Sequence, residues 1–148
     1  MSRVRSALFF GLSLLLAGSV AADSEVIGNI KSVKGNATIH RAGGQEAAAL
    51  GGPIYMNDTL KTGADGAVGV TFVDNTMVTI GADTEYVIDT FAYQPAQNQL
   101  GFASRLTKGS LQFVSGNMAK LKPESVSVNT PVGTIGVRGT RFLIKIDE

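Results

Sequence analysis

Apolar and polar residues alternate with a period of two along most of the chain, the pattern of β-strands with one buried face. The alternation is clearest in residues 126–146, which read V-S-V-N-T-P-V-G-T-I-G-V-R-G-T-R-F-L-I-K-I. Alternating runs begin at Val126, Ile135 and Phe142, and Thr130-Pro131 separates the first two. Proline cannot donate a hydrogen bond to a strand ladder and restricts the residue before it. We therefore predict three short strands in this segment.

Two further regions show a strand, a turn and a returning strand. Residues 26–41 contain two apolar runs around Lys34-Gly35-Asn36, and residues 68–80 contain two around Asp74-Asn75. Glycine, asparagine and aspartate in such positions are typical of tight β-turns. We predict a hairpin in each region.

The remaining strands are predicted one at a time, with polar loops between them. The predicted strands are residues 58–62, 86–91 and one or two within 106–114, and the predicted loops are 42–53, 92–101 and 116–124. Residues 45–50 form at most a single helical turn, which is too short to be stable alone.

Together the chain contains about nine to eleven short strands at intervals of roughly 8–12 residues, which is typical of a sandwich, roll or barrel. No stretch after the first 22 residues has the periodicity of an amphipathic helix of ten residues or more. We predict a single all-β domain with a sandwich-like or roll-like fold, and a short β-helix-like roll is the alternative.

Residues 1–22 have the composition of a secretory signal peptide. Arg3 and Arg5 precede a short apolar run, and small residues follow it. Cleavage is expected after Ala21 or Ala22, which leaves residues 23–148 as the domain. The alternative is an uncleaved N-terminal anchor. The signal predicts a periplasmic or secreted protein with no membrane span after cleavage.

Charge and cysteine content exclude several classes of protein. Without the leader, 11 basic and 12 acidic residues remain, so the net charge is near −1. A nearly neutral chain is not typical of nucleic-acid binding or of binding to an anionic membrane surface. The chain has no cysteine, so it contains no disulfide.

Few residues suggest catalytic chemistry. His40 is the only histidine, so a zinc site or a Ser-His-Asp triad would need unusual partners. Most carboxylates fall in turns, where they bond the local backbone: Asp58, Asp65, Asp74, Asp83, Glu85 and Asp89. A pair of carboxylates that converge as in a glycosidase is the remaining enzymatic alternative. We expect no catalytic residue, no cofactor and no metal.

The glycines at 133, 136 and 139 are spaced like a phosphate-binding loop, but strands flank them on both sides. Phosphate-binding loops of this kind join a strand to a helix. We therefore interpret the repeat as structural.

Several short motifs resemble those of the FecR domain family. The strongest is N-T-P-V-G-T-I-G-V-R-G-T-R-F at residues 129–142, which is similar to the family pattern T-P-x-x-x-x-x-V-R-G-T-x-F. Weaker similarities occur in the same order as in the family, in residues 28–37, 58–63, 67–76 and 108–111.

The resemblance implies an extracytoplasmic all-β domain. Members of the family that regulate sigma factors carry a cytoplasmic segment and a membrane helix before this domain, which receives a signal from an outer-membrane transporter. Only six residues precede the apolar run here, so the sigma-regulating function is not expected to carry over. We expect a non-enzymatic module that binds an envelope protein or a glycan in sensing or assembly.

The family pattern usually continues beyond the G-T-x-F strand into a further hairpin, whereas this sequence ends at Glu148. We expect residues 140–146 or a neighbouring strand to form an unpaired edge, which recruits another strand unless it is protected. A partner protein or a second copy could supply that strand. The alternative function is therefore a structural subunit that assembles by strand addition, with a homo-oligomer as one form.

Arg138 within the V-R-G-T-x-F motif has two interpretations. Its guanidinium group could bond several carbonyl groups of the neighbouring turn, or it could bind an acidic partner. We favour the structural role, which predicts that Arg138→Ala lowers the melting temperature markedly. The candidate structural or interaction motif comprises Thr130, Pro131, Gly136, Val137, Arg138, Gly139, Thr140 and Phe142.

Overall fold

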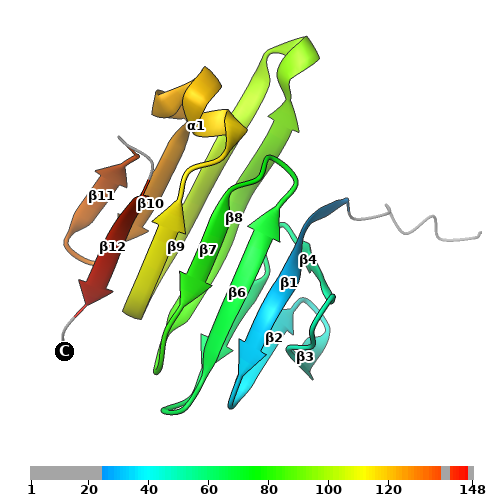
Figure 1. Ribbon diagram of the computed structural model, residues 1–148, viewed down its shortest axis with the longest axis vertical. Coiled ribbons are helices and arrows are strands. Elements are labelled where there is room, and N and C mark those ends of the chain that lie inside the picture. The colour runs from blue at the N-terminus through cyan, green and yellow to red at the C-terminus, as the bar shows by residue number, and fades with distance from the viewer. Residues whose placement is uncertain (1–24, 138–140, 147–148) are drawn as a thin grey trace, which may run out of the picture.

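The structure is a computed structural model that describes residues 25–137 and 141–146. Within these residues the chain forms twelve β-strands, one short α-helix and two 3-10 turns (Figure 1). This confirms the prediction of an all-β domain. The strand pairs are antiparallel except for β9 with β10.

The strands form one sheet that folds over into two layers. The first layer runs in the order β4 (Pro53–Tyr55), β1 (Val26–Lys34), β6 (Ala67–Phe72), β7 (Met77–Ile80), the end of β9 (Gln99–Val114) and β12 (Arg141–Ile146). The second layer runs in the order β3 (Gly44–Ala47), β2 (Ala37–Arg41), β5 (Thr59–Thr62), β8 (Glu85–Gln94), the beginning of β9, β10 (Val126–Thr130) and β11 (Gly133–Gly136).

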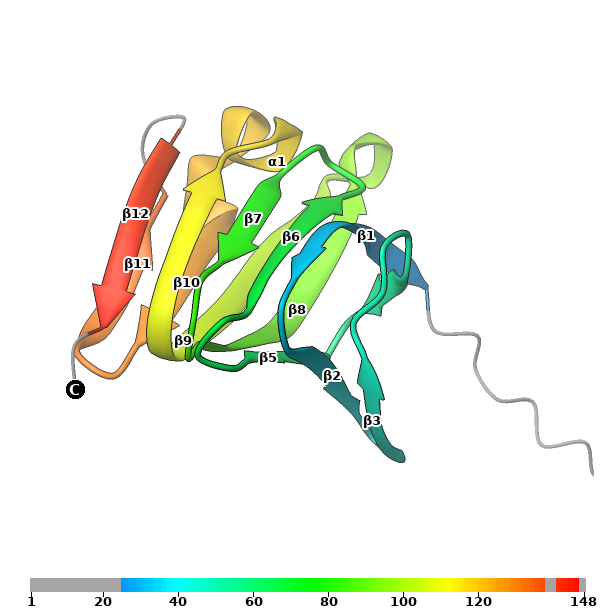
Figure 2. The ribbon, with the colours of Figure 1, turned by 60° about the horizontal axis from the view of Figure 1, so that its bottom comes forward.

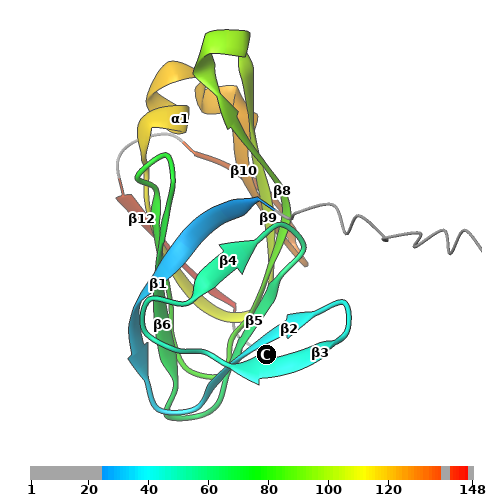
Figure 3. The same cartoon turned by 90° about the vertical axis from the view of Figure 1, so that its right-hand side faces the viewer.

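Strand β9 belongs to both layers and connects them (Figure 3). Its first part pairs with β8 and, in parallel, with β10, and its last part pairs with β7 and β12. The two parts meet near Gly109, whose φ of +91° lies in a region that side chains other than hydrogen rarely allow. A Cβ atom at this position would also overlap the side chain of Thr84. Glycine is therefore required where the strand turns from one layer into the other.

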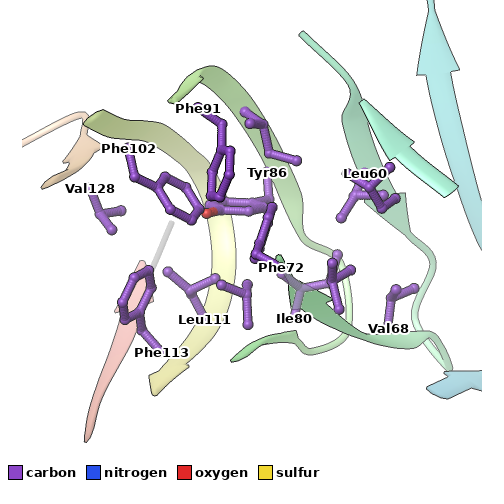
Figure 4. Packing of buried hydrophobic residues seen from close by; sticks show 14 of the residues in the cluster. Leu60, Val68, Phe72, Ile80, Tyr86, Phe91, Phe102, Leu111, Phe113 and Val128 are labelled. Atoms are coloured by element: carbon purple, nitrogen blue, oxygen red, sulfur yellow. The ribbon is translucent and has the colours of Figure 1, made fainter. Parts of the chain in front are cut away.

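The core lies between the layers and contains a chain of aromatic rings (Figure 4). Phe72 from the first layer packs on Phe91 and Phe102 from the second, with ring centroids 5.4 and 4.8 Å apart. Phe102 then contacts Phe113 at 6.0 Å, and Phe113 stacks on Phe142 at 5.0 Å. The strands place these rings inward because alternate side chains of a strand point to the same face.

The predicted hairpin in residues 26–41 is wrong. β1 pairs with β4 and β6 in the first layer, whereas β2 pairs with β3 and β5 in the second. The turn at Gly35-Asn36 is therefore a corner between layers. Both β1 and β2 pair with strands further along the chain, and the turn residues between them do not indicate these pairings. The hairpin predicted around Asp74-Asn75 is confirmed as β6 and β7.

The three predicted loops also contain regular structure. Residues 44–47 form β3 and residues 53–55 form β4, so 42–53 is not a plain loop. β8 extends to Gln94 and β9 begins at Gln99, which leaves only a short turn in residues 92–101. In the third predicted loop, residues 116–124, the helix α1 (Asn117–Leu121) precedes a 3-10 turn, η2 (Pro123–Ser125). The prediction that no helix reaches ten residues is confirmed for the described part of the chain.

Candidate functional site

The three strands predicted in the C-terminal segment are present as β10, β11 and β12. β10 and β11 form a hairpin whose tip is held by the Thr130 hydroxyl. This hydroxyl donates to the Gly133 carbonyl at 2.9 Å and accepts from the Val132 amide at 3.3 Å. Val132 at the tip is 94% exposed. The hairpin therefore presents an aliphatic side chain to solvent from an ordered turn.

The described members of the candidate motif lie in different parts of this region. Thr130 and Pro131 lie at the exposed tip, and Gly136 ends β11. Val137 is buried, and its amide donates to the Val126 carbonyl at 3.4 Å. Phe142 begins the inner face of β12 and stacks on Phe113. The other members of the motif, Arg138, Gly139 and Thr140, lie outside the described residues, so their roles stay predictions.

Strands β11 and β12 lie at one end of the domain (Figures 1 and 2). Within the described residues, β11 pairs only with β10 and β12 pairs only with β9. The inner side chains of β12 are half-buried, namely Phe142, Ile144 and Ile146, whereas those of β7 and of the end of β9 are fully buried. On the outer face of β12, Leu143 is 71% exposed. We call this region, defined by β11 and β12, the open end.

A hollow of about 770 Å³ lies beside the open end, between the α1–η2 segment and the β10–β11 hairpin. Val126 and Val137 provide apolar parts of its lining, and Lys120 and Glu124 provide charged parts. Glu124 is the one carboxylate among its lining residues in the described part of the chain. This lining does not provide the two carboxylates of a glycosidase.

Asp58 has a structural role that accounts for its burial. Only 2% of its side chain is exposed, and its carboxylate accepts from Arg41 Nε at 2.9 Å and from the Tyr55 amide at 2.9 Å. Arg41 also donates to the Pro53 carbonyl at 2.7 Å, contacts Glu46 and lies over the Tyr55 ring. These contacts fasten β2 and β3 to the segment that enters β5.

The charges around Arg41 outweigh the effect of its partial burial. Burial lowers the pKa of Arg41, but hydrogen bonds and charges from Asp58 and Glu46 raise it, and the net direction is upward. The guanidinium group is thus a fixed cation in a structural cluster.

Asp74 is also structural. It is fully buried and accepts hydrogen bonds from the Thr76 amide at 3.0 Å and from the Thr76 hydroxyl at 2.8 Å. It further accepts from the Met118 amide at 3.2 Å, which lies in the first turn of α1. The prediction that turn carboxylates bond the local backbone is therefore confirmed for Asp74. The additional bond to α1 was not predicted.

His40 is half-buried and its Nε2 atom lies 3.1 Å from the Thr38 hydroxyl, so it has a local polar partner. Among residues 25–137 and 141–146, no three side chains of the metal-binding types come together. No helix of the described part is both long and apolar enough to span a membrane.

The comparisons with known proteins identify a family. The FecR protein family matches residues 58–148. The resemblance seen in residues 28–37 lies before that match and stays a prediction. No curated protein matches the chain.

One solved structure, described as a "Cell surface anchoring domain", is 37% identical over 41% of this chain and 82% of its own length. Its TM-score is 0.40, so the shared shape is limited.

Proposed function

Because the chain belongs to the FecR protein family, we propose that it is a non-enzymatic, extracytoplasmic β-domain that binds another protein of the cell envelope. The observation that carries this proposal is the open end, where two strands are each paired on one side within the described residues. Unpaired strand edges present rows of backbone donors and acceptors to which an extended segment of a partner can add.

Exposed apolar side chains at the same end support a protein partner. Val132 at the hairpin tip and Leu143 on β12 are both largely exposed. In the described part of the chain, the exposed large apolar residues are aliphatic or methionine rather than aromatic. Sites for small molecules and sugars are usually concave and rich in aromatic side chains. A protein is therefore favoured over a glycan.

Asp58 and Asp74 lie in segments that resemble FecR motifs, and their structural roles support a non-enzymatic domain. Asp58 binds Arg41, and Asp74 holds the β6–β7 turn and the start of α1. A carboxylate engaged in this way stabilises a turn and is poorly placed to transfer a proton to a substrate. The leader-like composition of residues 1–22 and the family both support a location in the periplasm or outside the cell.

The test is to recover the partner from cells and then to measure its binding. The protein carries its own leader and a C-terminal tag, and cross-linked partners are purified from the periplasm and identified by mass spectrometry. Leu143→Asp is compared with Val73→Asp, since both replace an exposed apolar residue but only Leu143 lies at the open end.

We expect a partner that is recovered with the unaltered chain and with Val73→Asp but not with Leu143→Asp. The purified partner should then bind saturably in a titration, and the Leu143→Asp variant should bind at least about tenfold more weakly. Recovery of peptidoglycan or another glycan without any protein would contradict the proposal. Binding that is equally strong in both variants would show that the open end is not the site.

A further inference from the structure

The open end lies in a strongly basic part of the molecule. Within the described part of residues 99–146, six basic residues accompany one acidic residue, Glu124. The basic residues are Arg105, Lys108, Lys120, Lys122, Arg141 and Lys145, of which Arg105 is paired with Asp89 on the neighbouring strand β8. Residues 25–98 show the opposite balance, with four basic and eight acidic residues. Strands β9 to β12 lie together on one side of the fold and β1 to β4 on the other (Figure 1). The chain is nearly neutral overall but its charge is unevenly distributed, and its basic side contains the open end.

Charges and apolar groups alternate along β12. Its outer face carries Arg141, Leu143 and Lys145, and its inner face carries Phe142, Ile144 and Ile146. The inner side chains pack against the core but keep part of their surface exposed. A strand that adds to β12 would cover this surface with alternate apolar side chains. Its other side chains would lie beside Arg141 and Lys145.

A second copy of the chain is a poor occupant of this edge. Pairing of β12 with itself across a twofold axis brings two basic ends together. In the antiparallel register centred on Leu143, Arg141 of one copy lies opposite Lys145 of the other. Like charges directly opposite each other destabilise a strand pair. The charge on this side therefore favours a partner of opposite sign.

We propose that an extended acidic segment of a partner protein adds to the edge of β12 that pairs with no other described strand, with alternate apolar residues over Phe142, Ile144 and Ile146 and acidic residues beside Arg141 and Lys145. The proposal rests on the proposed function and specifies the chemistry of its partner. Asp147 and Glu148, which follow β12 in the sequence, lie outside the described residues.

The test uses the purified protein and synthetic nine-residue peptides labelled with fluorescein. One peptide alternates valine and glutamate, a second alternates valine and lysine, and a third repeats the first with N-methylated backbone amides. Fluorescence anisotropy reports binding at several salt concentrations, and hydrogen–deuterium exchange reports which amides the peptide protects. Arg141→Glu is compared with Lys31→Glu, an equal change of charge on β1 at the other side of the fold.

We expect the glutamate peptide to bind and the other two peptides to bind at least about tenfold more weakly. Binding should weaken as salt is added, because salt screens charges near the surface. The peptide should protect residues 141–146 from exchange. Arg141→Glu should weaken binding about fivefold or more, and Lys31→Glu should leave it within about twofold.

Failure to bind the glutamate peptide would overturn the proposal, as would protection of a different strand. A stable dimer of the protein alone by light scattering, with residues 141–146 already protected, would also overturn it in favour of a second copy. If the recovered partner binds in a manner sensitive to Leu143→Asp while the glutamate peptide does not, the acidic strand is wrong and the binding module stands. If no protein partner is recovered at all, the proposed function itself fails.

Discussion

Two arginine–aspartate pairs in this protein have similar geometry and different surroundings. Arg41 Nε lies 2.9 Å from Asp58, whose side chain is 2% exposed, and Arg105 Nε lies 2.8 Å from Asp89, whose side chain is 32% exposed. Removing one member of a buried pair leaves an uncompensated charge and buried donors, whereas an exposed pair is screened by water. Burial should therefore decide what each pair contributes.

We predict that Asp58→Ala lowers the free energy of unfolding by about 3 kcal/mol, because it leaves Arg41 and the Tyr55 amide without their acceptor. Asp89→Ala should lower it by less than about 1 kcal/mol. Urea unfolding followed by circular dichroism measures both. Equal losses in the two variants would contradict the structural role of Asp58.

Tyr86 places a polar group in the aromatic core. Figure 4 shows its ring reaching from β8 into the core cluster. In the described part of the chain, neither its hydroxyl nor that of Ser104 has a hydrogen-bond partner of normal geometry. Burial raises the pKa of Tyr86, and the nearby Ser104 opposes part of the shift. A buried hydroxyl group without a hydrogen-bond partner adds no stability, so phenylalanine should stabilise the core at least as well as Tyr86.

We predict that Tyr86→Phe is at least as stable as the unaltered protein at neutral pH. The raised pKa has a further consequence, because the unfolded chain releases the proton above about pH 10 while the folded protein retains it. The contribution of Tyr86 to the free energy of unfolding is complete below about pH 10 and is lost as the pH rises above it. The loss of stability between pH 9 and 11.5 should be smaller in the variant. An identical pH profile for both proteins would show that Tyr86 is not protected from ionisation.

At the level of single residues, the sequence predicted local partners better than distant ones. Aspartate in a turn predicts a bond to a nearby amide, and Asp74 makes one to Thr76. The same rule is silent about the Met118 amide, which is 44 residues away, or about the pairing of Asp58 with Arg41. Those contacts exist only after both layers have formed.

At the level of elements, alternation located most strands but did not choose their partners. β6 and β7 were predicted as a hairpin because the turn residues Asp74-Asn75 lie between two alternating runs that follow each other in the chain. The same kind of turn at Gly35-Asn36 connects strands of different layers. The polar residues of 92–101 suggested a loop, yet the long pairing of β8 with β9 continues through most of them. Pairing at a distance overrides composition in these elements.

The bend of β9 gives a prediction at this scale. Gly109→Ala should lower the free energy of unfolding by about 2–4 kcal/mol, because the backbone is strained for alanine and its methyl group meets Thr84. Gly101→Ala is the control, since it lies on the same strand and a Cβ there has open space around it. Chemical denaturation of both variants gives the comparison. A Gly109→Ala variant as stable as the control would show that the corner does not depend on glycine.

For the whole molecule, the class of fold was predictable and the order of strands was not. Inward apolar residues at every second position require two packed layers, whichever strands form them. The family pattern predicted an unpaired edge at residues 140–146 or a neighbouring strand, and within the described residues β12 pairs only with β9. The half-burial of Phe142, Ile144 and Ile146 appears only in the structure. The different charge balance of residues 25–98 and 99–146 can be counted in the sequence. Only the strand order shows that β1 to β4 and β9 to β12 lie on opposite sides of the molecule.

The uneven closure of the core should appear as a gradient of stability. Phe113 and Phe142 stack on each other, but Phe113 is fully buried and Phe142 is half-buried. We predict that Phe113→Ala costs about 3–5 kcal/mol and that Phe142→Ala costs about half as much, because less apolar surface is removed from the core. Equilibrium unfolding measures both. Equal costs would mean that the open end is as well packed as the interior.

The position of β9 along the chain sets the order in which the domain can assemble. β9 is the neighbour of β7, β8, β10 and β12, so neither layer is complete before residues 99–114 are available. A chain that emerges N-terminus first from a ribosome or a translocation channel therefore exposes the β6–β7 hairpin and β8 before their shared neighbour β9 is available. Such unpaired strands invite pairing with other chains. Folding should begin late and complete in one cooperative step, and a holdase chaperone would act most usefully on the chain before β9 appears.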